Sequence, residues 1–302
     1  MARETKRPLL AIALMLCANV AFVAMQAVVK SARQSGMHTM EVMFYRTAPG
    51  LPVLYWVLRR RGHSLKPEEP ADVLIRSLLG SLAMGTNFAA MLWLSLAQFS
   101  TLNLLQPVFV ALAAPLVLRE PLRVHVWSAL PLALAGALVL IVPGVETREI
   151  ALGAAFLGLS SALFSAFAQM WVRKATASEP PDRVVFHFAA FVSVLALIIG
   201  VPRGDFQALP SSESLAVRLL EIAGMAGFGT LGQALMTRAY SLGEAASVSM
   251  IAYASILLSM GADLLWWRQS PTLSALFGAL LVVLAGVVLV RGERRALPVA
   301  IR

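Results

Sequence analysis

Polar side chains inside long apolar runs are the residues of this sequence that could do chemistry. Arg46 lies five positions after Glu41 in one such run, about 7.5 Å further along a helix axis. An arginine inside a membrane costs at least about 2.5 kcal/mol on insertion scales, so its guanidinium should face protein or water. Arg46 therefore either snorkels or fixes its helix to a neighbour's carbonyls, or it attracts an anionic group or closes a gate.

Neutral polar side chains in the same runs form a larger group. Their amide, indole and phenol groups can hydrogen-bond a small molecule, although each can also simply join one helix to another. Gln26 and Gln169 stand 143 residues apart, which suggests equivalent positions of a repeated unit. Besides Asn19 and Gln106, the group contains the six residues that we expect to contact a small molecule, namely Gln26, Asn87, Trp93, Gln169, Gln233 and Tyr253.

Catalysis and metal binding find little support in the sequence. Gly158-Leu159-Ser160 with His187 has the residue types of an intramembrane serine protease, but Ser160 would lie about 18 Å from the membrane edge and His187 only about 4.5 Å. A nucleophile and its base must approach to about 3 Å. The four His residues show no metal-ligand spacing, so we expect no metal, no cofactor and no enzymatic activity.

The composition is that of a membrane protein. Hydrophobic residues make up 59% and charged residues 14% of the 302 residues, against about 25% charged residues in soluble domains. The net charge of +9 does not indicate nucleic-acid binding, because the basic residues lie at the ends of apolar runs and form no patch with interleaved aromatics. We expect a lipid bilayer and a small molecule as partners, and a homodimer stays open.

The apolar runs predict an all-α membrane protein with ten transmembrane helices, because lipid admits only helices or closed barrels and these runs are too long for barrel strands. The 42 residues from Ser77 to Leu118 contain no Asp, Glu, Lys or Arg and predict two helices with a turn near Gln98-Phe99-Ser100-Thr101. Pro49 and Pro52 should bend the second helix. The expected helices are Leu9–Val29, Met40–Leu58, Ile75–Leu96, Thr101–Leu118, Val124–Val142, Ile150–Val172, Val184–Val201, Leu219–Thr237, Ala245–Ala262 and Pro271–Val290.

The distribution of Lys and Arg predicts that both termini lie in the cytoplasm. With that orientation, 18 basic residues fall on the cytoplasmic side and six on the outer side, while Arg46 lies within a helix. The cytoplasmic count includes Arg76, which lies at the start of the third expected helix and is counted with the loop before it. Because cytoplasmic loops carry the excess of basic residues, the loops Arg59–Leu74 and Ala175–Asp182 should be cytoplasmic, and Pro202–Leu215 should be periplasmic.

The two halves of the chain share short motifs. Gly229-Thr230 follows Gly85-Thr86 after 144 residues, and Leu284-Ala285-Gly286 follows Leu134-Ala135-Gly136 after 150 residues. A spacing near half the chain length indicates duplication of a five-helix unit. Because five is an odd number, the second copy would be inverted in the membrane.

Two further motifs accompany these repeats: Pro107 in the fourth helix and the turn Arg119-Glu120-Pro121. On this set of motifs, the chain resembles the EamA type of the drug/metabolite transporter superfamily over about residues 8–292. The resemblance implies two inverted five-helix repeats, which we place at residues 8–142 and 150–291. It implies an inner-membrane secondary transporter that moves a small organic metabolite by alternating access through a central cavity. Two alternatives stay open: import of a larger aromatic or nucleoside-like metabolite such as riboflavin or S-adenosylmethionine, and a non-transporting membrane sensor or scaffold.

The position of the carboxylates bears on how such transport would be driven. Every acidic residue that can be placed is expected near a membrane face, whereas proton coupling usually needs a carboxylate near the midplane. We therefore expect neutral groups to hold the substrate and transport to be facilitative or weakly coupled. Asp263, beside Trp266-Trp267-Arg268, is either an interfacial cap or a gating carboxylate. The candidates for coupling or gating are Glu41, Arg46 and Asp263.

Overall fold

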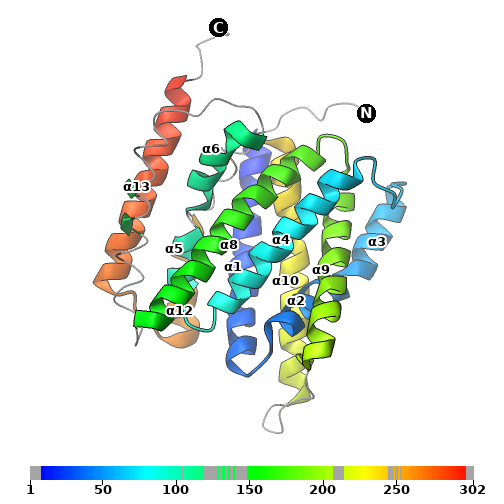
Figure 1. Ribbon diagram of the computed structural model, residues 1–302, viewed down its shortest axis with the longest axis horizontal. Helices are drawn as coiled ribbons and strands as arrows, with labels where there is room; N and C mark the ends of the chain where they lie inside the picture. Colours follow the sequence, from blue (N-terminus) through cyan, green and yellow to red (C-terminus); the bar gives the residue numbers. More distant parts are fainter. Residues whose placement is uncertain are drawn as a thin grey trace.

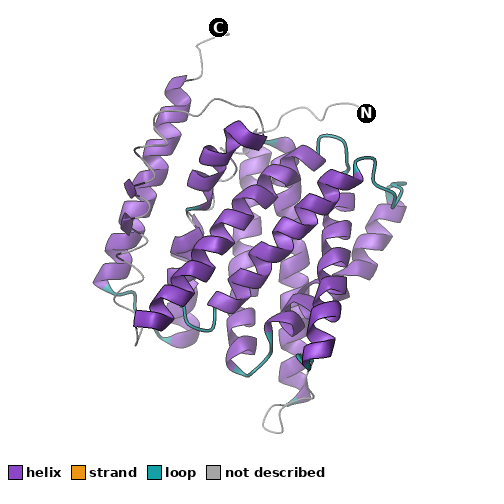
Figure 2. Cartoon of the chain, viewed as in Figure 1, coloured by secondary structure: helices purple, strands orange, loops and turns teal. Residues whose placement is uncertain are grey.

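Every regular element in the part of the chain that the structure describes is a helix (Figure 2). The structure is a computed structural model that describes residues 8–94, 96–103, 105–117, 128, 131–132, 135–136, 139, 148–206, 214–243, 248, 251 and 254–296. The elements are α1 (Pro8–Gln34), α2 (Thr39–Thr47), η1 (Ala48–Gly50), α3 (Leu51–Arg60), α4 (Pro70–Ala90), α5 (Leu96–Asn103), α6 (Gln106–Val117), α8 (Arg148–Ala175), α9 (Pro181–Arg203), α10 (Leu215–Leu242), α12 (Ala254–Trp267) and α13 (Leu273–Ala296).

Helices from the first half of the chain pack against helices from the second half. The most extensive contacts join α1 to α10 and α4 to α8, and α2 packs against α9 (Figure 1). The largest buried apolar cluster draws on the same helices and includes Met25, Met43, Phe88 and Phe188. The start of α1 and the end of α13 lie toward the same end of the molecule (Figure 1). The two halves therefore share one core.

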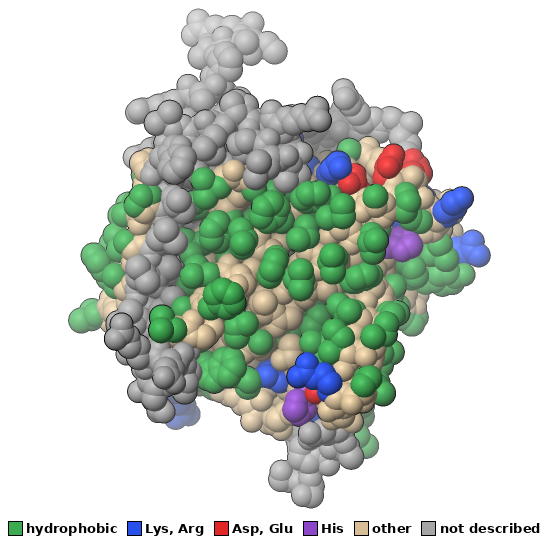
Figure 3. All heavy atoms as spheres, in the orientation of Figure 1, with side chains coloured by type: hydrophobic (Ala, Val, Ile, Leu, Met, Phe, Trp, Pro, Cys, Tyr) green, Lys and Arg blue, Asp and Glu red, His purple; other side chains and the backbone are tan. Residues whose placement is uncertain are grey.

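The outer surface of the helices is apolar. On the face drawn in Figure 3, hydrophobic side chains cover the middle, and charged side chains gather near two ends. Leu220 is 71% exposed and Leu273 85%, although soluble proteins rarely expose large contiguous apolar patches. This surface is that of a multi-pass membrane protein. Within the described ranges, five segments are long and apolar enough to cross a membrane: Leu9–Gln34, Pro70–Ala90, Leu152–Ala175, Pro181–Arg203 and Leu215–Leu242.

The second expected helix is broken where its prolines predict a bend. The expected span Met40–Leu58 is divided into α2, the short 3₁₀ turn η1 and α3. Pro49 lies within η1, and Pro52 lies in the first turn of α3. Proline removes a backbone donor and clashes with the preceding turn of an α-helix, which accounts for the change in helix type.

The turn between the third and fourth expected helices lies earlier than the sequence predicts. Gln98-Phe99-Ser100-Thr101 was expected to form this turn, but these residues lie inside α5. The turn is at residues 91–94, where the Met91 N–H donates to the Asn87 carbonyl and the Leu94 N–H to the Ala90 carbonyl. This turn contains no glycine or proline to mark it. The fourth expected helix, Thr101–Leu118, is divided into α5 and α6 just before Pro107.

The third expected helix begins five residues earlier than the sequence predicts. The α4 helix begins at Pro70 and has Asp72 in its first turn. Proline suits the first turn of a helix, because its missing N–H is not needed there and its fixed φ is already helical. Arg76, expected at the cytoplasmic start of the helix, therefore lies six residues inside it and is 3% exposed. The fifth expected helix, Val124–Val142, lies almost entirely outside the described residues.

Glycines allow α1 and α10 to pack closely. A Cβ atom on Gly232 would lie 2.8 Å from ring carbons of Phe22, and one on Gly224 would lie 3.3 Å from a methyl of Val28. Gly227 is on the same helix but is exposed, and a Cβ there would meet no atom within 4 Å. The contact between the two halves thus depends on the absence of a side chain at particular positions of α10.

We predict opposite effects for two alanine substitutions in α10. Gly232→Ala forces Phe22 to move and should lower stability by about 1–3 kcal/mol. Gly227→Ala adds a methyl in open space and should be neutral or stabilising by up to about 1 kcal/mol through helix propensity. Thermal unfolding of the detergent-solubilised variants would measure both. Equal shifts for the two variants would contradict close packing at Gly232.

Candidate functional site

A central cavity of about 190 Å³ lies between the two halves of the chain. Its walls come from α1, α2, α4, α5 and α6 in the first half and from α8, α9, α10 and α12 in the second. A mixed apolar and polar lining of this kind suits a small organic molecule. Among the described residues, the polar ones that line the cavity are Asn19, Gln26, Arg46, Arg76, Asn87, Asn103, Gln106, Ser165, Gln169, Gln233 and Ser255.

Helical spacing explains how polar residues of α1 and α4 reach the same cavity. On α1, Asn19 and Gln26 are seven residues apart, and on α4, Gly80 and Asn87 have the same separation. Residues seven apart lie two turns from each other on one face of a helix. Each helix therefore turns one face, with its few polar side chains, toward the cavity, while other faces pack or meet lipid.

Four of the six residues expected to contact a small molecule line the cavity: Gln26, Asn87, Gln169 and Gln233. Trp93 is 46% exposed and does not line it, because α4 ends at Ala90 and Trp93 lies in the following turn. We therefore leave Trp93 out of the candidate site. Tyr253 lies outside the described residues.

The cavity amides differ in their hydrogen bonding. The Tyr240 hydroxyl donates to the Gln169 side-chain oxygen, and Gln233 Nε2 donates to Thr237 Oγ1 at 3.4 Å. The side-chain oxygens of Gln26 and Asn87 are buried and have no hydrogen-bond partner among the described residues. Because buried polar groups are costly without partners, the Gln26 and Asn87 side chains are the better candidates to bond a molecule in the cavity.

Arg46 lies at the wall of this cavity and is 6% exposed. Its Nε contacts the Met25 sulfur at 2.9 Å, and its Nη1 contacts the Met84 sulfur at 3.6 Å. A thioether is only a weak acceptor. Neither snorkelling nor bonding to a neighbour's carbonyls, the two structural interpretations of Arg46, describes this geometry. The guanidinium instead lies inside the protein beside the cavity.

Arg76 is a second cavity arginine, which we did not expect from the sequence. Its guanidinium carbon lies 4.2 Å from the centre of the Phe188 ring, and its Nε and Nη1 have no hydrogen-bond partner in the described part of the chain. The residues Pro70-Ala71-Asp72 are a helix-start signal that would have placed Arg76 six residues inside a helix. Phe188 carries no comparable signal, because a cavity phenylalanine and a core phenylalanine look alike in a sequence.

Buried ion pairs join the two halves at the end of the molecule where α1 ends and α2 begins, here called the α1–α2 end. Arg218 Nη2 on α10 lies 3.2 Å from Glu41 Oε1 on α2, and the Arg218 and Glu41 side chains are 7% and 3% exposed. Arg218 also lies 3.8 Å from Glu221, which accepts a hydrogen bond from Ser31 of α1 at 3.0 Å. This cluster connects α1, α2 and α10.

A second buried ion pair lies at the same end. Lys30 Nζ on α1 is 3.2 Å from Asp263 Oδ1 on α12, and both side chains are 5% exposed. The same carboxylate oxygen accepts the Leu96 N–H of α5 at 3.3 Å, and the ammonium lies 4.3 Å from the Trp267 ring centre. Asp263 therefore joins three helices, which is more than the interfacial cap considered from the sequence.

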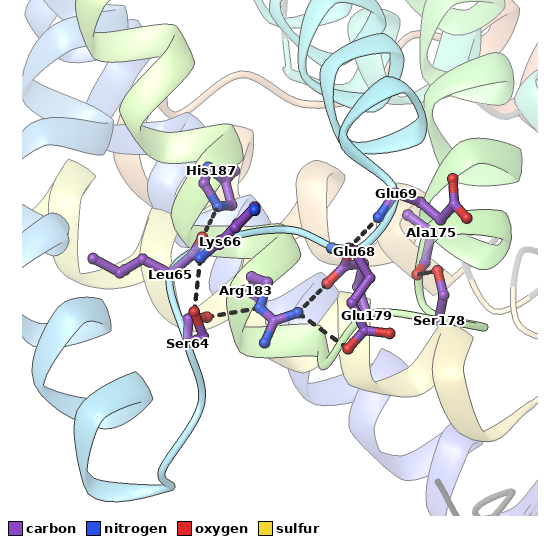
Figure 4. A network of polar contacts seen from close by, with 10 residues as sticks. All are labelled: Ser64, Leu65, Lys66, Glu68, Glu69, Ala175, Ser178, Glu179, Arg183 and His187. Carbon is purple, nitrogen blue, oxygen red and sulfur yellow. Dashed lines mark hydrogen bonds and ion pairs between the residues drawn. The ribbon is translucent and has the colours of Figure 1, made fainter.

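A polar network joins the two halves at the opposite end, where the loop between α3 and α4 meets the loop between α8 and α9. Arg183 donates from Nε to the Ser64 carbonyl at 2.8 Å and pairs with Glu179 and Glu68 (Figure 4). Lys174 pairs with Asp72 at 2.8 Å but is 49% exposed. We call this the α3–α4 end. The loops Arg59–Leu74 and Ala175–Asp182 thus lie on the same side, as the topology requires.

The serine protease interpretation is not supported by the position of His187. Its Nε2 lies 2.7 Å from the Leu65 carbonyl in the network of the α3–α4 end (Figure 4). Over the described ranges, no group of three or more His, Cys, Asp or Glu residues could hold a metal ion. The absence of a cofactor stays a prediction.

Comparison with known proteins gives consistent results. The sequence profile of the EamA-like transporter family matches residues 9–142 and 152–291. The pseudopaline exporter CntI of Pseudomonas aeruginosa is 30% identical over 281 residues, covering 93% of this chain and 96% of that protein. A riboflavin transporter of Vibrio cholerae is 23% identical and covers 93% of each chain. One solved crystal structure superposes with a TM-score of 0.67 at 18% identity, over 96% of this chain and 99% of the other.

These matches agree with the physical character of the molecule. The apolar helices suit a multi-pass membrane protein, and the polar-lined cavity between the two halves suits a protein that handles small molecules. The family profile covers nearly the whole chain in two segments, and the Pseudomonas relative matches over nearly its full length. The chain therefore belongs to the EamA-like transporter family.

Proposed function

We propose that this protein is a secondary transporter of the inner membrane that moves a small organic metabolite by alternating access. The transport path is the central cavity, and the moving units are two inverted five-helix repeats at residues 8–142 and 150–291. Ten helices cross the membrane, and both termini lie in the cytoplasm. In this orientation the α1–α2 end is periplasmic and the α3–α4 end is cytoplasmic.

One observation carries this proposal: the cavity is built jointly by the two halves. Gln26, Arg46 and Asn87 reach it from the first half, and Gln169 and Gln233 reach it from the second. Transporters made of inverted repeats bind their cargo at the repeat interface and expose it by rocking one repeat against the other. The two separate segments matched by the family profile support the same division of the chain.

The polar clusters at the two ends are suited to act as gates. Both connect the first half to the second, so a rocking motion must break one cluster while the other stays intact. Glu41 and Asp263 belong to the periplasmic gate, through Arg218 and Lys30. Removing one partner of a buried ion pair leaves an uncompensated charge, at a cost of about 3–5 kcal/mol to the closed arrangement. A single neutral substitution should therefore open the gate.

We predict that Asp263→Asn exposes the cavity to the periplasm. Lys30 then loses its counter-charge and is stabilised by the water that enters on opening. With Ser165→Cys as a reporter in the cavity and Cys17→Ser as background, an impermeant thiol reagent applied from outside should react about tenfold faster or more.

Asp72→Asn is the matched control for this labelling experiment. It removes a carboxylate from an ion pair at the opposite end, with Lys174, and should not speed labelling from the periplasm. Equal rates in the parent and in Asp263→Asn would contradict a gate at Lys30 and Asp263.

The orientation can be tested by labelling a loop. In a Cys17→Ser background, a cysteine at position 64 should be inaccessible to impermeant reagents outside intact cells, because the basic loop Arg59–Leu74 is expected in the cytoplasm. A cysteine in the loop Pro202–Leu215 should be labelled. Labelling of position 64 from outside would overturn the topology.

Transport itself should be facilitative or weakly coupled to protons. Arg46 and Arg76 are the only charged residues among the described residues that line the cavity, which supports a path without a carboxylate that exchanges a proton with the substrate. In proteoliposomes offered a metabolite mixture, uptake should depend on the protein and change little with an imposed pH gradient. Uphill accumulation that survives loss of both Glu41 and Asp263 would place the coupling site elsewhere. Absence of any protein-dependent uptake would favour a sensor or scaffold.

A further inference from the structure

The cavity holds positive charge without a matching negative charge. Arg46 and Arg76 are both more than nine-tenths buried and both line the cavity. No Asp or Glu lines it in the described part of the chain, and neither arginine forms an ion pair with a described residue. A guanidinium stays protonated in proteins, so the described lining of the cavity carries two positive charges. Charges inside membrane segments usually mark a substrate or ion pathway.

The contacts of the two arginines leave hydrogen-bonding capacity unused. Arg46 faces the sulfurs of Met25 and Met84, which are weak acceptors. Arg76 lies over the ring of Phe188, which stabilises the cation through its face but takes no strong hydrogen bond. A purely structural arginine would bond carbonyls or carboxylates, and none of its described neighbours provides one.

Two glycines make room for these side chains. A Cβ atom on Gly80 would overlap the Arg76 guanidinium, and one on Gly229 would lie 2.9 Å from Arg46 Cγ. The glycines lie on α4 and α10, and both helices contribute residues to the wall of the cavity. The backbone is therefore shaped to hold each arginine beside the cavity, although no described residue provides either with a counter-charge.

Arg76 lies against Gly80 of α4, and Arg46 contacts Met84, which is one turn further along the same helix. The two guanidiniums therefore lie beside neighbouring turns of α4, where their like charges repel each other. A ligand with one negative charge would neutralise only one of them, whereas a dianion would compensate both and remove their repulsion. We infer that the cargo of this transporter is a small organic dianion whose oxygens bridge Arg46 and Arg76. This inference rests on the proposed transport function.

Carboxylate and phosphate groups both fit this description, because the planar guanidinium fork bonds either in a bidentate manner. A dicarboxylate would place one carboxylate on each arginine, and a phosphate monoester would share one dianionic group between them. Gln26 and Asn87 offer side-chain oxygens without partners, so the rest of the cargo should carry N–H or O–H donors. The neutral amides expected from the sequence would then orient the cargo, and the arginines would select its charge.

The first test measures binding to the purified full-length protein. Thermal unfolding in detergent at constant ionic strength is followed with dicarboxylates from succinate to pimelate, each against its diamide, and with glycerol 3-phosphate against glycerol. At least one dianion should stabilise the wild type in a saturable manner, and its neutral counterpart should not. Whether the dicarboxylates or the phosphate ester bind tells the two chemistries apart. Equal effects of the neutral compounds, or no effect of any dianion, would overturn the inference.

The variants Arg46→Gln and Arg76→Gln should each weaken dianion binding about tenfold or more, because each removes charge-assisted hydrogen bonds. Arg46→Lys should also lose most of the affinity, since lysine keeps the charge but not the planar fork. Arg60→Gln is the matched control, because Arg60 is exposed at the end of α3, and it should bind normally. Unchanged binding in both cavity variants would overturn the inference.

The unliganded variants separate a substrate role from a structural one. Loss of an uncompensated charge should leave the unfolding temperature of the empty protein unchanged or higher. A marked fall in that temperature for both glutamine variants would mean that the arginines hold the helices together, and would overturn the inference.

Transport measurements distinguish this inference from the proposed function. The best dianion from the binding panel is used as labelled cargo for counterflow in proteoliposomes. If it binds in an arginine-dependent manner but never crosses, the transport function fails and the dianion site stands. If proteoliposomes carry a neutral solute at a rate that Arg46→Gln and Arg76→Gln leave unchanged, transport stands and the dianion inference fails.

Discussion

The cost of keeping positive charge away from water is the constraint on which the rest of this structure depends. Two guanidiniums lie inside a body whose outer surface is apolar, and an uncompensated buried charge is normally destabilising. Polarisable side chains reduce this cost: methionine sulfurs contact the Arg46 guanidinium, and the Phe188 ring face lies against the Arg76 guanidinium. These contacts tolerate a cation without neutralising it, and no described carboxylate compensates it; in our proposal the cargo provides the remaining compensation.

Buried charges near the ends of the helices, unlike the two arginines of the cavity, are paired with carboxylates. There each buried cation has a carboxylate partner from another helix: Lys30 with Asp263, and Arg218 with Glu41. At the opposite end, Arg183 pairs with Glu179 of the loop before its own helix and with Glu68 of the first half. The role of a buried arginine or lysine thus depends on its position along the helices. Paired charges join the halves of the chain near its ends, and unpaired charges face the space between the halves.

The sequence alone predicts the existence of the helices better than their ends. Long apolar runs are a strong signal, and the prolines at positions 49 and 52, which predict a bend in the second helix, lie where the structure interrupts it. The turn at residues 91–94 has no glycine or proline and escapes such reasoning. Because the turn lies at residues 91–94 and not at residues 98–101, Trp93 falls in the turn and does not line the cavity. Four of the expected residues do line it: Gln26, Asn87, Gln169 and Gln233. Arg76 is missed because a loop count of basic residues ignores the helix-start signal at Pro70. Pairing across helices, as for Glu41 with Arg218, depends on tertiary contacts that no local pattern encodes.

The unequal burial of the two end clusters has a consequence for how the protein responds to its surroundings. At the α1–α2 end the side chains of the pairs Lys30–Asp263 and Arg218–Glu41 are 3–7% exposed. At the α3–α4 end Arg183 and Glu179 are buried, but the pairs that join the two halves each have a half-exposed partner: Arg61 with Asp182 (51%), Lys174 with Asp72 (49%) and Glu68 with Arg183 (57%). Dissolved ions screen exposed pairs strongly and buried pairs hardly at all. Raising the salt concentration should therefore loosen one end selectively. With the alternating access proposed above, the resting equilibrium between the two open forms would then depend on the ionic strength at the α3–α4 end.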